Sequence, residues 1–557
     1  MRLGMSMKLK TLVFLSLLYL SRGGYATDAA LAMPDQFSAD TVEEILLSGG
    51  NAIDAAIAAA FSLAATFPEA GNIGAGGFMM SYMKGEAAFL DFRERAPGAA
   101  NRDMYLNESG QVVESSTIIG GRASGVPGTV RGMQAAHKRY GSLPWKRLLQ
   151  PAITLAEKGF IVHPTLAELI DEAVKSFGEQ TNFKHYFGDT SAGQRFVQPE
   201  LAQTLRRIAI DPEDFYQGTI AHQIVAQMER SGGIITLQDL SAYKAIWREP
   251  LRAPWREYEV LGAPPPSSGG FALIQLLLMR DFAQPLFADR SHNSARYIHL
   301  LAELEKRVFA DRAEYLGDPD FVTVPLGKLL APAYLQARIG AINPKAISKS
   351  ESVKPGIESH QTTHFSILDK QGNAVALTYT LNWEFGSGVV VEDAGFLLNN
   401  QMDDFSALSG MPNKFGVIGG DFNAIAPGKR MLSSMSPTIL LRDNQASLII
   451  GTPGGSTIFT SVFQVILNLY DFDMPLQAAV AATRFHHQLP AATLLRHDQR
   501  QIPLQTKVEL ETMGYVVRPN SWGNLGDIQA IQHQSGKTFA VADPRGRGVA
   551  KLLLPSP

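Results

Sequence analysis

The sequence predicts a mixed α/β protein, and two kinds of segment support this prediction. Residues 363–380 and 436–452 each contain two β-rich stretches around a short polar turn, as in β-hairpins. Runs with apolar residues at helical spacing lie elsewhere in the chain, for example at 51–66, 199–209 and 294–309. The 557 residues suffice for two to four average domains or for one large intertwined domain.

Composition narrows the class of protein. Hydrophobic residues make up 45% of the chain and charged residues 18%, which is typical of a globular protein. The net charge of −3 argues against nucleic acid or an anionic membrane as the main partner. The chain has no cysteine, so disulfides, thiolate metal sites and a cysteine nucleophile are excluded.

The first 26 residues are typical of a signal peptide. Basic residues within 2–10 precede an apolar run at 11–20 that is too short to span a bilayer comfortably. Residues 24–26 (Gly-Tyr-Ala) form a small-x-small cleavage site, and 30–32 (Ala-Leu-Ala) form a second one. We therefore expect an exported protein, periplasmic or secreted, and an uncleaved anchor is the alternative.

The first half of the chain begins with two predicted helices and a glycine-rich segment. A capped helix at 38–47 is followed by an Ala-rich helix at 51–66, whose length and Asp54 favour a buried helix over a membrane span. The segment 71–78 does not complete GxGxxG, because Met79 takes the last position, and no lysine follows for a phosphate loop. Close backbone packing beside a site is therefore favoured over nucleotide binding.

The first predicted hairpin brings two threonines together. Folding the chain about 371–372 pairs positions whose numbers sum to about 742, so that Thr362 and Thr380 face each other at the open end. A threonine hydroxyl is a poor nucleophile unless a base lies beside it. Cutting the chain just before Thr362 would free an α-amine with a pKa of about 7.7–8.0, which is one way to supply that base.

The same arithmetic applies to the second hairpin, whose strands are expected at 436–442 and 447–452. Their position numbers sum to about 888, which places Ser434 opposite Gly454. A glycine-rich turn at 451–456 then leads into an apolar helix that ends near residue 469. Backbone N–H groups at a helix start bind anions, and glycines let a ligand approach closely.

With these motifs the chain resembles the gamma-glutamyltransferases, N-terminal-nucleophile amidohydrolases that cut themselves before a threonine. Similar motifs extend from about Gly49 to Arg545, and the block 362–404 is the most specific of them. The resemblance implies a four-layer αββα sandwich that two fragments of the chain form jointly. It also favours signal cleavage after Ala26, because a cut after Ala32 would remove the segment that matches the family's first core strand.

The resemblance implies self-cleavage between Gln361 and Thr362. The chain would then consist of a signal peptide (1–26), a large subunit (27–361) and a small catalytic subunit (362–557), with the two subunits associated as a heterodimer. The polar stretch 345–360 is flexible by composition, which suits a segment that must move after the cut.

The resemblance also implies roles for individual residues. Thr362 would be the nucleophile, with its own α-amine as base, and Thr380 would position it. Gly454 and Gly455 would form the oxyanion hole. Six further residues would bind the α-amino-acid end of the substrate: Arg93, Ser433 and Ser434 its carboxylate, and Asn382, Gln401 and Asp404 its ammonium group.

Two of these residues have ordinary structural explanations on sequence alone. An arginine at a strand end, such as Arg93, is usually a surface charge, and an Asp-Asp pair in a turn, such as 403–404, is usually a helix cap. The segment 409–421 aligns with the lid over the family's substrate pocket. Phe415 lies where the family often has a tyrosine, so a lid closed by a hydroxyl hydrogen bond is in doubt here.

The expected activity is the attack of Thr362 on the γ-glutamyl amide of glutathione or a similar compound, with release to water or to an amino-acid or peptide acceptor. We expect no cofactor and no metal, since His486 and His487 have no third ligand at useful spacing. We also expect no nucleic-acid partner, and no membrane contact after signal removal. Two alternatives remain: a cephalosporin-acylase-like amidase of the same superfamily, and a non-catalytic exported binding protein.

Overall fold

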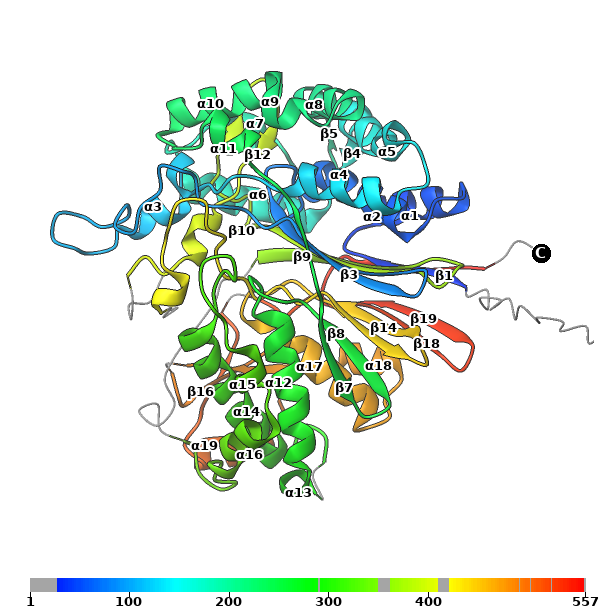
Figure 1. The fold of residues 1–557 in the computed structure, drawn as a ribbon, viewed down its shortest axis with the longest axis vertical. Coiled ribbons are helices and arrows are strands. Elements are labelled where there is room, and N and C mark those ends of the chain that lie inside the picture. Colours follow the sequence, from blue (N-terminus) through cyan, green and yellow to red (C-terminus); the bar gives the residue numbers. More distant parts are fainter. Residues whose placement is uncertain are drawn as a thin grey trace, which may run out of the picture.

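The computed structural model describes residues 28–288, 291–348, 361–408, 420–489, 491–500, 502–521 and 523–554. The expected signal peptide, most of the polar stretch before Gln361, and Phe415 lie outside these residues. Two β-sheets pack face to face in the middle of the molecule, and helices cover the outer face of each (Figure 1). The predicted four-layer αββα sandwich is confirmed.

The first sheet has the strand order β20-β1-β9-β10-β2-β3-β6, and each neighbouring pair is antiparallel. Its strands are β1 (Ala29–Met33), β2 (Gly76–Met83), β3 (Glu86–Asp91), β6 (Ile246–Arg248), β9 (Gln361–Leu368), β10 (Ala374–Asn382) and β20 (Val549–Leu553). In this sheet β1, from before the expected cleavage point, lies between β20 and β9, and β9 and β10 lie between β1 and β2.

The second sheet has the order β19-β18-β14-β13-β8-β7, again antiparallel throughout. Its strands are β7 (Leu251–Trp255), β8 (Tyr258–Gly262), β13 (Thr438–Arg442), β14 (Gln445–Gly451), β18 (Gln529–Gln534) and β19 (Lys537–Ala542). Apolar side chains from both sheets, among them Phe78, Leu261 and Ile449, form a buried core between the two sheets.

Helices from residues 36–241 cover the first sheet, at the top of Figure 1. They are α1 (Gln36–Leu47), α2 (Ala52–Thr66), α3 (Glu114–Ile118), α4 (Thr129–Tyr140), α5 (Trp145–Lys158), α6 (Pro164–Phe177), α7 (Phe183–Phe187), α8 (Pro199–Ile210), α9 (Asp214–Gln217), α10 (Thr219–Ser231) and α11 (Leu237–Ser241). The fully buried helix α2 lies in the core of this layer, as its Ala-rich sequence predicts.

The second sheet is covered by a helical layer at the bottom of Figure 1. These helices are α12 (Gly269–Phe282), α13 (Gln284–Phe287), α14 (Ala295–Tyr315), α15 (Leu326–Leu329), α16 (Pro332–Gly340), α17 (Thr457–Tyr470), α18 (Leu476–Ala481) and α19 (Leu504–Thr512). Among the described residues, none of the helices combines the length and the apolar character that a membrane span requires.

Smaller elements join these layers. They are the strand pairs β4 (Phe160–Ile161) with β5 (Arg195–Phe196) and β11 (Val390–Val391) with β12 (Phe396–Leu397), the sheet of β15 (Phe485–His487), β16 (Leu494–His497) and β17 (Val516–Pro519), and the 3₁₀ turns η1 (Gly121–Ala123), η3 (Gln401–Asp404) and η4 (Asp421–Asn423).

Both predicted hairpins are present. Strands β9 and β10 pair with position sums of 742 along most of their length, and β13 and β14 pair with sums of 888 and then 887. The predicted pairing of Thr362 with Thr380 falls where the register of β9 and β10 shifts, and the ladder of β13 and β14 ends at Thr438 and Ile450, before Ser434 and Gly454. Helix α1 begins earlier than expected, because Asp35 caps it by accepting a hydrogen bond from the backbone N–H of Ser38 (2.7 Å).

The glycine-rich segment lies between β-strands and packs closely against them. A Cβ atom built on Gly74 would lie 2.0 Å from the carbonyl oxygen of Leu397, and one on Gly77 would lie 2.4 Å from that of Thr378. The segment therefore has glycines because backbone atoms approach it closely, as predicted, and it is not a nucleotide-binding loop.

Candidate active site

Thr362 and Thr380 lie at the open end of the first hairpin, at the centre of the first sheet. The pairing register of β9 and β10 shifts between Tyr379 and Asn382, and Asn382 has a φ of +85°. The Thr380 hydroxyl accepts a hydrogen bond from the backbone N–H of Asn382 (2.8 Å), which stabilises this bulge. Bulges of this kind redirect side chains, and here the side chains on either side of the bulge line one pocket with Thr362.

The pocket is small, with a volume of about 240 Å³ including its open mouth. It is lined by Arg93, Thr362, Thr380, Asn382, Gln401, Asp404, Ser433, Ser434, Met435, Gly455 and Ile458. The structure thus brings the expected nucleophile together with the six residues expected to bind substrate, although they come from three separate parts of the chain.

Arg93 is fully buried directly after β3, so its interpretation as a surface charge is wrong. Its Nη2 pairs with Asp404, and its Nε donates to the carbonyl oxygen of Met431 (3.4 Å). Its Nη1 has no hydrogen-bond partner among the described residues, although Glu94 Oε2 lies 3.5 Å away. This nitrogen can therefore donate to a ligand.

Asp404 and Gln401 lie at the two ends of the turn η3. Gln401 Nε2 donates to Asp404 Oδ2 (2.7 Å), which fixes both side chains relative to each other. The other oxygens, Gln401 Oε1 and Asp404 Oδ1, are buried and have no hydrogen-bond partner in the described part of the chain. Burial raises the pKa of Asp404, and the opposing charge of Arg93 lowers it.

Ser433 and Ser434 precede β13, and hydrogen bonds to the Ser433 backbone fix their position. The Ser433 carbonyl oxygen accepts from both the N–H and the hydroxyl of Ser268 (2.6 and 2.7 Å), and Arg312 Nε donates to that hydroxyl (2.9 Å). Ser434 Oγ is buried without a described hydrogen-bond partner. Burial lowers the pKa of Arg312 to about 9, and the charge of Asp404 opposes this shift.

Several positioning residues were not predicted from the sequence. Ser268 lies in a Pro- and Gly-rich turn and Arg312 lies near the end of α14, and neither has a sequence spacing that indicates a role. Asn399 Oδ1 accepts a hydrogen bond from the backbone N–H of Gly125 (2.8 Å). The Asn423 side chain donates to the Asp404 carbonyl oxygen (2.7 Å) and accepts from the backbone N–H of Leu432. From sequence alone, a buried asparagine that connects two loops cannot be distinguished from an asparagine in an ordinary turn.

Gly454 and Gly455 lie between β14 and α17. Both have positive φ angles, +130° and +55°, and a Cβ atom on Gly454 would lie 2.5 Å from Thr457 Oγ1. Gly455 lines the pocket described above, whereas Gly454 lines a second cavity that also contains Thr362. Each glycine therefore shares a cavity lining with Thr362, where backbone N–H groups can approach a reacting oxygen.

The two adjacent histidines of β15 have structural partners. His486 Nδ1 lies 3.0 Å from Thr460 Oγ1 and its Nε2 lies 2.8 Å from Gln488 Oε1, while His487 Nδ1 lies 2.9 Å from the Leu494 carbonyl oxygen. Burial lowers the pKa of His486 to about 4 and that of His487 to about 3. Within the described residues, His, Asp and Glu form no group of three or more that could hold a metal ion.

The fold and the site together define a class of protein. Two packed sheets between helical layers, with a threonine at the start of a central strand and a polar pocket beside it, make an N-terminal-nucleophile hydrolase fold. A family model described as gamma-glutamyltranspeptidase matches residues 38–553. The chain belongs to the gamma-glutamyltranspeptidase family and is an enzyme of that family.

Similar proteins support this assignment over nearly the whole chain. A glutathione hydrolase proenzyme of Pseudomonas aeruginosa is 56% identical over 529 residues, which cover 94% of this chain and 95% of the relative. A glutathione hydrolase proenzyme of Escherichia coli is 43% identical and covers 93% and 91% of the two chains.

Solved structures agree with the fold. The cephalosporin acylase of Bacillus halodurans matches with a TM-score of 0.82 at 26% identity and covers 97% of this chain and 99% of that one. The gamma-glutamyltranspeptidase of Pseudomonas nitroreducens complexed with L-DON matches with a TM-score of 0.57 at 52% identity. That match covers 58% of this chain and 96% of the other.

Proposed function

We propose that this protein is a self-processing gamma-glutamyltransferase that hydrolyses glutathione and related γ-glutamyl compounds. The observation that carries the proposal is a set of four buried polar atoms in the pocket beside Thr362 that lack hydrogen-bond partners among the described residues. Two are donors, Arg93 Nη1 and Ser434 Oγ. Two are acceptors, Asp404 Oδ1 and Gln401 Oε1.

An α-amino-acid group is the chemical complement of these four atoms. Its carboxylate accepts from a guanidinium and a hydroxyl, and its ammonium donates to a carboxylate and an amide oxygen. An isolated buried polar atom costs about 1–3 kcal/mol, so a ligand that satisfies all four gains affinity and orientation. The γ-carboxamide of a bound γ-glutamyl group then extends toward Thr362.

In the proposed processing step, the Thr362 hydroxyl attacks the carbonyl carbon of Gln361. The bond between that carbon and the Thr362 nitrogen breaks, and water hydrolyses the resulting ester. The products are the large subunit (27–361) and the small subunit (362–557). Processing frees the α-amine of Thr362, which is then available as a base.

In the proposed turnover, the free α-amine accepts the proton of the Thr362 hydroxyl as it attacks the γ-amide. Thr380 positions the nucleophile, and the backbone N–H groups of Gly454 and Gly455 stabilise the oxyanion. The leaving amine takes the proton, and a γ-glutamyl ester forms on Thr362. Water or an acceptor amine releases the γ-glutamyl group and restores the hydroxyl.

The two subunits are proposed to remain associated as a heterodimer without a cofactor. Support comes from the strand order of the first sheet, in which β1 and β2 from one fragment flank β9 and β10 from the other. The Pseudomonas nitroreducens chain that covers 58% of this one is close in extent to the expected large subunit.

We further propose export to the periplasm or the medium, based on residues 1–26.

The acylase alternative has support from the Bacillus halodurans structure and from an acylase ACY 1 proenzyme of Pseudomonas that is 35% identical over 453 residues. A glutaryl group has no α-ammonium, so it would leave Asp404 and Gln401 without a ligand. The pocket therefore favours a γ-glutamyl substrate. The alternative of a non-catalytic binding protein does not explain why Thr362 and Thr380 line the same pocket.

The test combines processing with substrate choice. We expect intact mass and N-terminal sequencing of the purified protein to give two fragments, the smaller beginning Thr-Thr-His. A γ-glutamyl anilide should turn over at least a hundredfold faster than the matching glutaryl anilide. Thr362→Ala should stay uncut and inactive. An uncut Thr362→Ala protein that is fully active would refute the mechanism, and faster glutaryl turnover would favour the acylase.

A further inference from the structure

Two short segments carry three of the four unpartnered polar atoms in the proposed substrate pocket. The first, residues 401–404, provides the buried acceptors Gln401 Oε1 and Asp404 Oδ1, and we call it the acidic segment. The second, residues 431–434, provides the buried donor Ser434 Oγ, and we call it the serine segment. A ligand with a cation and an anion on neighbouring atoms must contact both segments at once. The separation of the two segments therefore decides which ligands fit.

Asn423 connects the two segments, although it is not among the residues that line the pocket. Its Nδ2 donates to the Asp404 carbonyl oxygen in the acidic segment (2.7 Å). Its Oδ1 accepts from the backbone N–H of Leu432 in the serine segment (2.9 Å). Asn423 is only 6% exposed, so water competes little for these two bonds. A single side-chain amide thus links the backbones of both segments.

Arg93 is a second connection between the segments, but it has another task. Its Nη2 pairs with Asp404, while its Nε and Nη2 donate to the carbonyl oxygens of Met431 and Leu432 at 3.4 Å each. Hydrogen bonds of this length are weak. In the proposed function the same guanidinium also binds the substrate carboxylate. The side chain of Asn423, by contrast, bonds only to backbone groups of the two segments.

The turn η4, which carries Asn423, is itself held in place. Lys429 is 4% exposed, and its Nζ donates to the carbonyl oxygens of Phe422 (2.8 Å) and Ala424 (3.0 Å), the residues on either side of Asn423. A Cβ atom on Gly317 would lie 2.3 Å from the Phe422 carbonyl oxygen, so the chain just after α14 packs closely against the same turn. The connection made by Asn423 is therefore preformed, as the geometry of a binding site requires.

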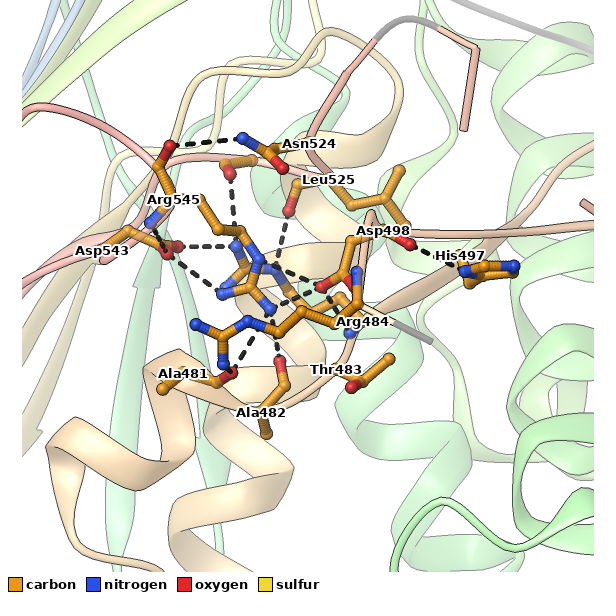
Figure 2. A network of polar contacts seen from close by, with 12 residues as sticks. Ala481, Ala482, Thr483, Arg484, His497, Asp498, Asn524, Leu525, Asp543 and Arg545 are labelled. Carbon is orange, nitrogen blue, oxygen red and sulfur yellow. Dashed lines mark hydrogen bonds and ion pairs between the residues drawn. The ribbon is translucent and has the colours of Figure 1, made fainter. Parts of the chain in front are cut away.

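Another buried polar network in the molecule is complete in itself. Figure 2 shows Arg484 and Arg545 converging on Asp498 and Asp543. Arg484 Nη2 donates to Asp543 Oδ2 (2.6 Å), and Arg545 Nε donates to Asp498 Oδ2 (3.0 Å). Among the described residues, these four side chains have no buried polar atom without a partner. The network of Asn423 differs, because the segments that it joins end in unpartnered atoms that face a pocket.

We propose that Asn423 is a positioning residue that sets the separation of the acidic and serine segments, and thereby the preference of the pocket for an α-amino acid over a plain carboxylic acid. The inference rests on the proposed function, because it concerns the same pocket. The ammonium and carboxylate groups of an α-amino acid are attached to one carbon atom, so the groups that bind them must be held at a fixed short distance. A ligand without the ammonium group does not depend on that distance.

Asn423→Asp tests this connection with almost no change in side-chain size. The variant keeps an oxygen that can accept from Leu432, but it replaces the donor to the Asp404 carbonyl by an oxygen that repels it. Asn182→Asp is the matched control. Asn182 also joins two loops, since it donates to the Val390 carbonyl oxygen and accepts from the Val390 N–H (2.9 Å each), but it is not part of the pocket lining.

The experiment measures the binding of L-glutamate and glutarate, which differ only in the α-ammonium group, to the processed proteins by isothermal titration calorimetry. Wild-type enzyme should bind L-glutamate more tightly than glutarate. In Asn423→Asp we expect the Kd of L-glutamate to rise about tenfold and that of glutarate to change less than about twofold. The KM for a γ-glutamyl anilide should rise with the Kd of L-glutamate, while kcat changes little. Asn182→Asp should lower the melting temperature but keep the wild-type ratio of the two Kd values.

The outcomes separate the two proposals. A processed wild-type protein that does not hydrolyse a γ-glutamyl anilide would contradict the proposed function. A processed Asn423→Asp enzyme with the wild-type ratio of Kd values would overturn the role of Asn423 alone, and so would an equal loss of L-glutamate binding in Asn182→Asp. If Asn423→Asp is not processed, Lys429→Met takes its place. It releases the backbone on both sides of Asn423, so we expect a smaller change in the same direction, and an unchanged ratio would again refute the inference.

Discussion

Single residues in the pocket beside Thr362 leave buried polar atoms without hydrogen bonds among the described residues, at some cost to folding. Arg93 Nη1, Asp404 Oδ1, Gln401 Oε1 and Ser434 Oγ are buried without described hydrogen-bond partners. Each such atom destabilises the folded state by about 1–3 kcal/mol. The cost is tolerable because Arg93 and Asp404 also pair with each other, so neither charge is isolated.

Ser434→Ala tests the contribution of one of these atoms. A hydrogen bond from a hydroxyl to a charged carboxylate is worth about 1.5–3 kcal/mol, which corresponds to a roughly ten- to hundredfold change in affinity. We expect KM for a γ-glutamyl substrate to rise by about that factor, with a smaller effect on kcat. Steady-state kinetics measures both, and Ser241→Ala on the exposed end of α11 is the control. An unchanged KM would show that Ser434 does not contact the substrate.

Sequence reasoning found the residues of the pocket but not the residues that hold them. Arg93 could be selected only through the family resemblance, because an arginine at a strand end is usually exposed. Ser268 and Arg312 act on Ser433 through a chain of hydrogen bonds across more than a hundred residues of sequence. No local pattern encodes such a contact, since it arises only when α14 packs beside the turn before α12.

At the scale of elements, the hairpin of β9 and β10 sets the geometry of the site. Its buried side chains make the register unique, because a slip of one residue would turn every side chain to the opposite face. His364 on β9 contributes to this register. Its Nδ1 lies 2.7 Å from Thr378 Oγ1 on β10 and its Nε2 lies 3.2 Å from Ser366 Oγ, so the ring is fully buried and neutral.

This burial predicts a pH dependence of stability. Burial lowers the pKa of His364 to about 3, whereas the unfolded value is near 6.5. The unfolded chain therefore binds an extra proton between pH 6.5 and 3, and stability falls as the pH falls through this window, by up to about 1.4 kcal/mol per pH unit.

Calorimetric melting between pH 7 and 5 checks this contribution. In His364→Gln the melting temperature should be lower at pH 7 but should fall less steeply toward pH 5. His222→Gln, on the exposed face of α10, should keep the wild-type slope. An unchanged slope in His364→Gln would contradict the argument, because it would mean that the ring binds protons equally in the folded and unfolded protein.

Helices and strands could be predicted from the sequence where neighbouring residues alone determine them. Position sums of 742 and 888 gave both hairpin registers, because polar turns and alternating β-rich residues specify pairing locally. The bulge before Asn382 was not predicted. It depends on the Thr380 hydroxyl bonding to the Asn382 backbone, and a threonine in a strand is normally an ordinary β-residue.

At the scale of the whole molecule, the expected fragments share one sheet and several apolar cores. Strand β1 lies between β20 and β9, and β10 lies between β9 and β2. Nothing in the periodicity of the sequence predicts this order, because strands hundreds of residues apart become neighbours. The family resemblance predicted the four layers. The order of the strands within a sheet depends on packing between distant segments, which the sequence does not show.

The interleaved sheet leads to a prediction about the processed protein. Separating residues 27–361 from 362–557 would break the ladders of β1 with β9 and β20 and of β2 with β10, and would expose the three largest apolar cores of the described residues. Burial on this scale far exceeds that of an ordinary protein–protein interface, so the two fragments should behave as one folding unit.

Size-exclusion chromatography under native conditions should therefore show both fragments in one peak, at the mass of the intact chain or a multiple of it. In a urea titration they should separate only at the concentration where circular dichroism reports loss of secondary structure. The uncut Thr362→Ala protein is the matched control, because it has the same sheets but a continuous chain. Separation of the fragments before unfolding would show that the first sheet does not hold the processed protein together.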